Sequence, residues 1–290
     1  MKGSLMQRIR EVSAAALQSG ALLPIPTDCE YIEDAGIRFI VRVVSSLRRK
    51  DEEKKRQKEV LPGRRVNPFL PPDAELYIGE VTETHSAVLN KFNVIDRHLL
   101  IVTKEFESQE MLLTEDDFAA LLICMEEYDG LGFYNGGAQA GASQPHKHLQ
   151  LVPLPLSDSG PRVPIEPLFR DARFNAGVGV LPAFPFVHAF AFFNSRGTAV
   201  RTVFGTYQAL LEGTGLRPPQ AGKPREQSGP YCLLMTKEWM LLVPRSREFF
   251  EGISINSLGF AGSLFVRDAN ELALIRRAGP LAVLRSVALP

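Results

Sequence analysis

The segment GASQPHKHLQ, residues 141–150, places two histidines and a glutamine at alternate positions. Residues two apart on a strand point to the same face, so His146, His148 and Gln150 are predicted to line one face. A neutral imidazole can attack phosphorus at physiological pH without a separate base. The spacing therefore predicts phosphoryl chemistry with a histidine nucleophile and a neighbouring carboxamide donor.

A run of small residues precedes the histidines and forms what we call the small-residue loop, residues 136–144. Its Gly and Ala residues, including Gly141 and Ala142, let backbone N–H groups approach an anion closely. Ser143 and Gln144 add side-chain donors at its end. Such donors stabilise charge on the non-bridging oxygens of a phosphate. We therefore predict that this loop binds phosphate.

Two other interpretations fit the same spacing. A His-x-His pair on a strand can bind zinc, but a tetrahedral site needs two further ligands. The remaining histidines, His85, His98 and His188, have no matching spacing, and the three cysteines form no CxxC pair. A purely structural role is the second alternative, although two histidines and a glutamine make a poor apolar surface. Residue types alone leave both alternatives open.

The elements expected around this motif predict an α+β fold. Helical periodicity covers residues 2–18, and a β-branched run covers 37–44. Short strands separated by polar turns are predicted within 76–106. Residues 114–130 predict a helix with Thr114 as its N-cap, between strands. This order favours an antiparallel sheet flanked by helices over alternating βαβ units.

The chain divides into two predicted regions, residues 1–160 and 184–290, joined by a Pro- and Gly-rich connector over 161–183. A helix is predicted at 198–215 and a pair of apolar strands at 231–246. The phrase MLLVPRSREFFEG resembles HLLIVTKEFESQE in pattern and charge. We therefore expect a second, related half that forms a larger sheet with the first.

Composition limits the possible partners. The chain has 33 basic and 33 acidic residues, and this neutral balance argues against wholesale binding of a nucleic-acid backbone. No apolar run approaches the roughly 20 residues that span a bilayer. Three widely spaced cysteines are expected to be reduced core thiols of a cytoplasmic protein. These features predict no membrane partner, and they leave the oligomeric state unspecified.

The motif also resembles a known family. HKHLQ after GGAQAGASQ is similar to the His-x-His-x-Gln motif in the transferase branch of the histidine triad superfamily. The resemblance is greatest to the ATP adenylyltransferases, or diadenosine tetraphosphate phosphorylases, and covers most of residues 67–155 and 231–290. It implies a histidine-triad-like antiparallel sheet flanked by helices. It also implies phosphorolysis of diadenosine tetraphosphate to ATP and ADP, reversibly, through an adenylyl-histidine.

The resemblance assigns roles to the three motif residues. It makes His148 the nucleophile that attacks the α-phosphorus. Gln150 stands where the hydrolase branch has a third histidine, and an amide cannot shuttle a proton to water as imidazole can. This difference suits transfer to phosphate. His146 is expected to orient the site or neutralise charge.

The resemblance also implies a set of substrate contacts. Asn90, with Lys91 beside it, is expected to hold ribose, and Asn135 with Gly141–Gln144 to contact phosphates. Lys50 could reach the polyphosphate from the N-terminal segment. A stretch closing over the distal nucleotide is expected to contain Asn256, Ser257, Leu258, Ser263 and Arg267. For Lys50, Lys91 and Arg267, a solvated surface position is the alternative.

The family resemblance implies a divalent cation, such as Mg²⁺, carried by the phosphates of the nucleotide. No tightly bound metal is predicted, because no carboxylate cluster is visible. Nucleotides and inorganic phosphate are the expected small-molecule partners. Two alternatives remain: an ADP sulfurylase or uridylyltransferase of the same fold, and a non-catalytic nucleotide- or zinc-binding protein.

Overall fold

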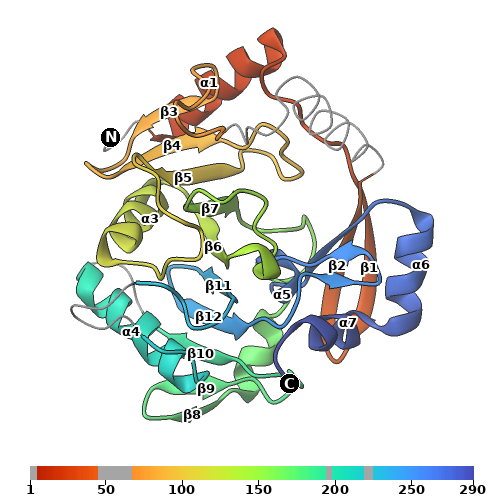
Figure 1. Ribbon diagram of the computed structural model, residues 1–290. Helices are drawn as coiled ribbons and strands as arrows, with labels where there is room; N and C mark the ends of the chain where they lie inside the picture. The colour runs from red at the N-terminus through yellow and green to blue at the C-terminus, as the bar shows by residue number, and fades with distance from the viewer. Residues whose placement is uncertain (1–4, 45–66, 194–197, 219–224) are drawn as a thin grey trace.

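The computed structural model describes residues 5–44, 67–193, 198–218 and 225–290, and its centre is a ten-stranded sheet (Figure 1). Every neighbouring pair in it is antiparallel. In spatial order the strands are β3 (Tyr77–Glu80), β4 (His85–Leu89), β5 (Leu99–Thr103), β7 (His148–Pro153), β6 (Gly130–Gly136), β11 (Tyr231–Met235), β12 (Trp239–Pro244), β10 (Ala189–Phe192), β9 (Val178–Val180) and β8 (Arg173–Asn175).

The sheet consists of two halves related by topology. The order β3-β4-β5-β7-β6 is repeated in reverse as β11-β12-β10-β9-β8, and each half has one helix after its third strand. The strand registers agree as well. In the first half, Val102 of β5 pairs with His148 of β7, and in the second half, Phe192 of β10 pairs with Trp239 of β12 at the equivalent position. The predicted second half is therefore confirmed. The predicted internal match is wrong in detail, because β12 takes the position of β7 and not of β5.

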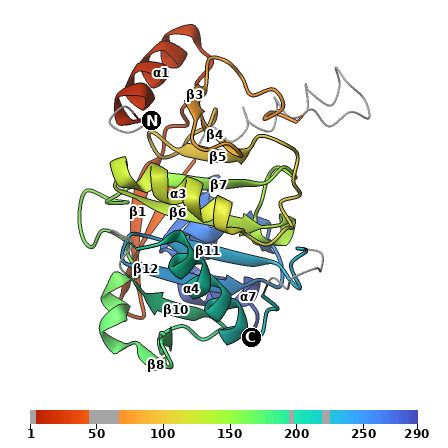
Figure 2. The same ribbon diagram turned by 90° about the vertical axis from the view of Figure 1, so that its left-hand side faces the viewer.

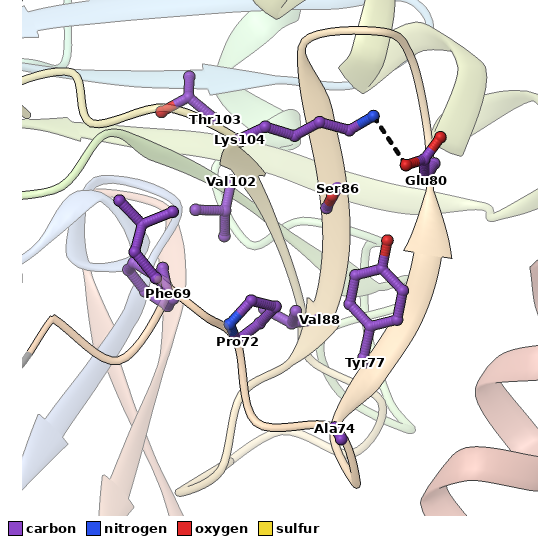
Figure 3. A pocket seen from close by; sticks show the side chains of 11 residues that line it. Phe69, Pro72, Ala74, Tyr77, Glu80, Ser86, Val88, Val102, Thr103 and Lys104 are labelled. Carbon is purple, nitrogen blue, oxygen red and sulfur yellow. Dashed lines mark ion pairs between the residues drawn. The ribbon is translucent and has the colours of Figure 1, made fainter.

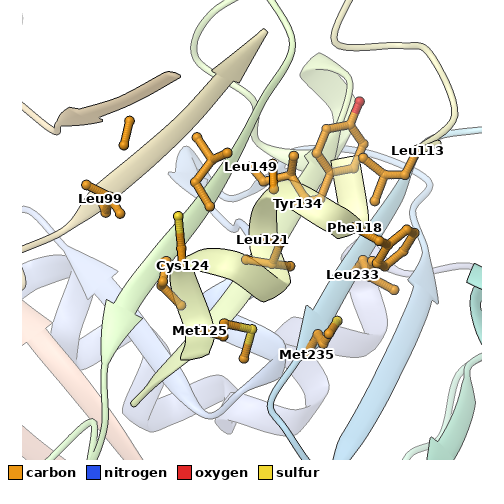
Figure 4. Close-up of a cluster of buried hydrophobic side chains, with 14 of the residues drawn as sticks. Leu99, Leu113, Phe118, Leu121, Cys124, Met125, Tyr134, Leu149, Leu233 and Met235 are labelled. Atoms are coloured by element: carbon orange, nitrogen blue, oxygen red, sulfur yellow. The ribbon is translucent and has the colours of Figure 1, made fainter. Parts of the chain in front are cut away.

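Three helices cover one face of this sheet (Figure 2). They are α1 (Leu5–Ser19), α3 (Glu115–Glu127) and α4 (Val200–Gly213). Their apolar sides join one buried cluster with alternate strand residues such as Leu149 and Leu151 (Figure 4). Full burial of such a side chain contributes about 1.5–3 kcal/mol. Since Leu149 and Leu151 point toward the helices, the residues between them face the opposite side, which we call the site face.

The site face is covered mainly over the second half of the sheet. A second buried cluster joins β10, β11 and β12 to the C-terminal elements. A three-stranded sheet also lies here, in the order β1-β2-β15. The covering elements are β1 (Asp28–Asp34), β2 (Ile37–Val43), β15 (Ser263–Val266), α5 (Ser257–Phe260), α6 (Ala269–Ala278) and α7 (Pro280–Val287), with a small hairpin of β13 (Phe249–Phe250) and β14 (Ile253–Ser254).

Three details differ from the sequence-based expectations. The segment 161–183 contains η2 (Glu166–Asp171), β8 and β9, so it extends the sheet instead of only connecting two regions. Strand β1 escaped prediction because it is charged and largely exposed. A turn at Ala35 and Gly36, both with positive φ, pairs it with β2. Cys29 is exposed, whereas Cys124 and Cys232 lie in the core as expected.

A buried charge network lies under the motif on the helix-covered face. The Lys147 ammonium donates to the Asp117 carboxylate at 2.7 Å and to Glu107 at 3.2 Å. His85 Nε2 donates to the other oxygen of Asp117 at 3.0 Å. Asp117 also closes the capping box with Thr114, which confirms the predicted start of α3. Burial alone would raise the pKa of Asp117, but the bonds from His85 and Lys147 outweigh it and lower the pKa to about 2.

Removing Asp117 should therefore destabilise the whole fold. In Asp117→Ala, Lys147 would remain buried without its closest carboxylate, and a broken buried pair costs about 3–5 kcal/mol. Asp116→Ala is the matched control, because Asp116 is exposed in the same turn and its loss should cost under about 1 kcal/mol. Urea unfolding measures the free energy of unfolding of both variants. Equal losses of this free energy would contradict the stabilising role of the network.

Within the described residues, no helix has the length and apolar character needed to cross a membrane. Each of α1, α3 and α4 instead has one buried side and one exposed side.

Candidate active site

The two motif histidines lie on the site face, and Lys147 lies on the other face, as the alternation predicts. The ring of Phe69 contacts both imidazoles, with centroids 5.6 Å from His146 and 5.4 Å from His148. Phe69 belongs to the proline-rich segment before β3, which crosses the sheet at this point. The two histidines therefore share one aromatic neighbour, and both are buried.

His148 has the protonation state of a nucleophile. Its Nδ1 lies 2.8 Å from the carbonyl oxygen of His146, which can only accept a hydrogen bond. Nδ1 therefore carries the proton, and Nε2 has the free electron pair. Burial lowers the pKa of the imidazole to about 4, so His148 is neutral at physiological pH. A neutral, buried, oriented imidazole is suited to attack an electrophilic phosphorus.

His146 uses both of its ring nitrogens in contacts with the protein. Nε2 donates to the Thr103 carbonyl at 2.9 Å. Nδ1 accepts from the amide of Asn67 at 2.9 Å, and the oxygen of that amide is fixed by the N–H of Phe69 at 3.0 Å. His146 could ligate a metal only by breaking one of these bonds. Its carbonyl accepts the hydrogen bond from Nδ1 of His148, and these contacts together argue against the alternative zinc pair.

A chain of hydrogen bonds orients Gln150. The Asn90 amide donates to Nδ1 of His98 at 3.1 Å, and Nε2 of His98 donates to the Gln150 side-chain oxygen at 2.9 Å. The Asn90 oxygen accepts from the N–H of Phe92, which fixes the direction of the chain. Because its oxygen is occupied, Gln150 presents its NH₂ group as the end that can bind a phosphate. Contact of Asn90 with ribose stays a prediction.

Asn135 is oriented in the same way by a residue 122 positions further along the chain. The Asn135 side-chain oxygen accepts from the backbone N–H of Ser257 at 2.9 Å and lies 2.6 Å from its hydroxyl. The NH₂ group of Asn135 is again the end left to donate. The structure thus brings together two regions that the resemblance assigned to substrate binding.

The small-residue loop packs directly on this C-terminal stretch. Gly141 has a φ of 92°, and a Cβ there would lie 2.9 Å from the Cβ of Asn256. Asn256 in turn caps α5 by accepting from the N–H of Leu258. Within the described chain, the backbone N–H groups of Ser143 and Gln144 have no hydrogen-bond partner, and both residues are at least partly exposed. They are the loop's available anion donors.

Gln109 is a site residue that the sequence analysis missed. The pairing of β6 and β7 extends to Phe133 and Gln150. Beyond it, the Gln109 side chain lies between the two strands. Its NH₂ group donates to the carbonyls of Asn135 at 2.9 Å and His148 at 3.2 Å, and its oxygen accepts from the N–H of His148 at 2.8 Å. No periodicity in the sequence signals a contact of this kind.

A cavity of about 370 Å³ lies on the site face, lined by residues of β3, β4 and β5 and of the proline-rich segment (Figure 3). It shares Phe69 and Thr103 with the histidine pair, and an ion pair between Lys104 and Glu80 lies at 3.0 Å on its wall. Its remaining lining is mostly apolar: Leu70, Pro72, Ala74, Tyr77, Ser86, Val88 and Val102. A second, more polar cavity of about 540 Å³ borders the small-residue loop at Gly137–Gln139.

The structure does not join every predicted residue to this centre. Ser263 is buried at the start of β15, where it pairs with Ile40. Arg267 is exposed, pairs with Glu271 and donates to the carbonyl of Gly252 at 3.2 Å. Lys91 lies over the ring of Phe92. Lys50 lies outside the described residues. The substrate roles of these four residues stay predictions.

Among the described residues, no group of three or more His, Cys, Asp or Glu side chains is placed to hold a metal ion.

The fold and the histidine centre define a nucleotidyltransferase of the histidine triad type, and the comparisons specify its family. The chain belongs to the Ap4A phosphorylase family: residues 1–171 match the Ap4A phosphorylase N-terminal domain, and residues 182–290 match the ATP adenylyltransferase C-terminal domain.

Individual relatives agree with this assignment. Diadenosine 5',5'''-P1,P4-tetraphosphate phosphorylase 2 of Saccharomyces cerevisiae is 28% identical over 301 residues, covering 93% of this chain and 89% of that protein. Protein APA1 of the same yeast is 31% identical, covering 70% and 69%. The crystal structure of yeast Ap4A phosphorylase Apa2 has a TM-score of 0.79 at 25% identity, covering 100% of this chain and 99% of that one.

The depressed pKa of His148 predicts the pH dependence of the first chemical step. Transfer to His148 should be constant from about pH 8 to about pH 5, because only protonation of the imidazole removes its electron pair. It should fall with a midpoint near 4 instead of the ordinary 6.5. A rapid-quench assay with a dinucleoside polyphosphate, which has no terminal phosphate, measures this rate. A midpoint near the ordinary value would mean that His148 is solvated.

The free energy of unfolding should also decrease as the pH falls from 6.5 to about 4. In this interval the imidazole of His148 takes up a proton in the unfolded chain but not in the folded one.

Gln109→Ala should slow the reaction by misplacing the nucleophile. The backbone of His148 would lose its side-chain clamp, and a displacement of about 1 Å can cost roughly 100-fold in rate. We expect a loss of about 10- to 100-fold in the single-turnover rate. Gln18→Ala, which alters an exposed glutamine of α1 outside the site, is the control and should retain the rate. A wild-type rate in Gln109→Ala would show that strand pairing alone holds His148.

Proposed function

We propose that this protein phosphorolyses diadenosine tetraphosphate to ATP and ADP, reversibly, through an adenylyl group carried on His148. The observation that supports this most directly is the neutral, buried imidazole with its proton fixed on Nδ1. The S. cerevisiae relative that matches 93% of this chain is a diadenosine tetraphosphate phosphorylase. A crystal structure of yeast Apa2 in complex with Ap4A has the same fold, with a TM-score of 0.77.

In the first step, Nε2 of His148 forms a bond to the α-phosphorus of the dinucleotide. The bond from that phosphorus to the bridging oxygen breaks, and ATP leaves with the electron pair and needs no proton. The imidazole becomes a cation, which the His146 carbonyl stabilises through the hydrogen bond from Nδ1. The NH₂ groups of Gln150 and Asn135 and the backbone N–H groups of the small-residue loop stabilise the charge on the phosphate oxygens.

In the second step, an oxygen of inorganic phosphate attacks the same phosphorus. The P–N bond breaks, the electron pair returns to Nε2, and ADP is released. Gln150 can bind the attacking phosphate but cannot accept a proton from water. This chemistry supports transfer to phosphate over hydrolysis.

The cavity beside the histidines is our proposed pocket for the nucleoside of the transferred AMP. It is adjacent to His146 through Phe69 and Thr103. Its apolar walls, including Val88 and Val102, suit a flat base, and its volume of about 370 Å³ is within the range of small-molecule sites.

We further propose that Mg²⁺ enters with the substrate. A tetraphosphate carries several negative charges, whereas the donors around His148 are neutral amides and N–H groups. A cation bound by the phosphates would offset that charge.

A cytoplasmic location is also our proposal, and it is supported by the free state of all three cysteines.

The adenylyl-enzyme can be trapped by withholding phosphate. Incubation with diadenosine tetraphosphate labelled in the adenosine should leave labelled AMP on His148, released as ADP when phosphate is added. His148→Ala should lose both the label and at least about 1,000-fold in rate, because the covalent route is removed. Peptide mapping and product chromatography measure the two effects.

Cys29→Ser is the control for adventitious labelling, because Cys29 is an exposed nucleophile outside the site and its loss should change nothing. Phosphorolysis at the wild-type rate in His148→Ala would overturn the mechanism. Replacing phosphate by sulfate, or diadenosine tetraphosphate by a sugar nucleotide, tests the same-fold alternatives. Faster turnover with either would change the assigned substrate.

A further inference from the structure

The side chain of Arg245 is buried beneath the small-residue loop. Arg245 follows β12, is 1% exposed, and is the largest fully buried side chain of the described residues. Its guanidinium donates to the carbonyls of Ala140 at 3.2 Å and Ile255 at 2.9 Å. It also donates to the carbonyls of Val287, Arg247 and Glu248, and to Cys232 Sγ.

These contacts join the two segments that present phosphate donors. Ala140 immediately precedes Gly141, which packs against Asn256. Ile255 precedes the stretch whose Ser257 orients Asn135. A single guanidinium therefore fixes the backbone on both sides of the contact between the small-residue loop and the C-terminal stretch.

Arg245 also brings an unbalanced charge close to Asn135. Its Nη1 lies 3.1 Å from Cys232 Sγ, and Cys232 is the cross-strand partner of Asn135. Among the described residues, its partners are carbonyl oxygens, the thiol and the ring of Phe260, so no carboxylate neutralises it. Arginine cannot lose its proton in a protein, and a buried charge without a counter-charge is costly.

We propose that Arg245 is a positioning residue for the small-residue loop and that its buried charge is balanced by the phosphate chain of the bound nucleotide. The proposed function supplies the identity of that ligand. The guanidinium touches no substrate atom itself. It acts through the backbone that it holds and through the field that it creates at the phosphate subsite.

Binding measurements separate the charge from the packing. Adenosine has no phosphate, so its affinity reports the base pocket alone, whereas ATP also reports the phosphate subsite. In Arg245→Gln, the ratio of ATP affinity to adenosine affinity should fall by about tenfold or more, because the attractive charge is absent. Isothermal titration measures both affinities, and circular dichroism confirms folding. An unchanged ratio in a folded variant would overturn the charge role.

Arg245→Lys tests the positioning role without removing the charge. An ammonium cannot reproduce the fork of donors to Ala140 and Ile255. We expect kcat for phosphorolysis to fall by about tenfold or more, with the affinity ratio within about twofold of wild type. A wild-type kcat would overturn the positioning role. A tenfold fall in the ratio of ATP affinity to adenosine affinity would overturn the charge role. Arg245→Lys therefore tests both the positioning role and the charge role, even if Arg245→Gln does not fold.

Arg170→Gln is the control, because Arg170 is exposed on η2 and pairs with the surface residue Asp171. Its replacement should leave all values unchanged. The affinity ratio requires only that the wild-type protein binds nucleotides. The affinity ratio therefore tests the role of Arg245 independently of the proposed reaction. The reaction itself is tested by trapping AMP on His148.

Discussion

The hydrogen bond from Nδ1 of His148 to the carbonyl of His146 is the interaction on which the site depends. It fixes one tautomer, and burial keeps that tautomer neutral. The bond can be held only if the backbone between the two histidines is rigid. Gln109 provides this on one side by bonding both the N–H and the carbonyl of His148, and Thr103 provides it on the other by holding the ring of His146.

The same logic extends to the residues around the nucleophile. The side-chain oxygens of Gln150 and Asn135 are occupied by His98 and Ser257. Each amide therefore has a fixed direction, with its acceptor turned to the protein and its donor available to an anion. Pre-set donors need no reorganisation when charge develops on phosphorus, and this is how an enzyme gains most from electrostatics. The elements behind these amides are consequently part of the site.

The sequence predicted those features that depend on local pattern. Alternation placed His146 and His148 on one face and Lys147 on the other. The capping signal located the start of α3 at Thr114, and the family phrases indicated the right enzyme class. Features that depend on residues distant in sequence were not predictable in this way. Gln109 lies in a loop and Arg245 directly follows an apolar strand, and neither position has a periodic signature.

Segment 161–183 shows why composition misled at one point. Pro and Gly mark turns, and here the turns bound very short strands at the end of the sheet. Strand β1 was missed for a related reason, since most of its residues are exposed and its pairing with β2 leaves no mark in the pattern of apolar residues.

The repeated register of the two half-sheets has a stoichiometric consequence. In the second half, Trp239 and Leu241 occupy the positions that His148 and Gln150 occupy in the first. Phe169 packs on Trp239 at 5.1 Å, much as Phe69 packs on His148. One half of the duplicated architecture keeps the reactive group, while the other has an indole and an aliphatic side chain in its place. Of these paired positions, each polypeptide thus has one imidazole that can carry the proposed adenylyl group, and the second half of the sheet supports the small-residue loop and the C-terminal stretch by packing.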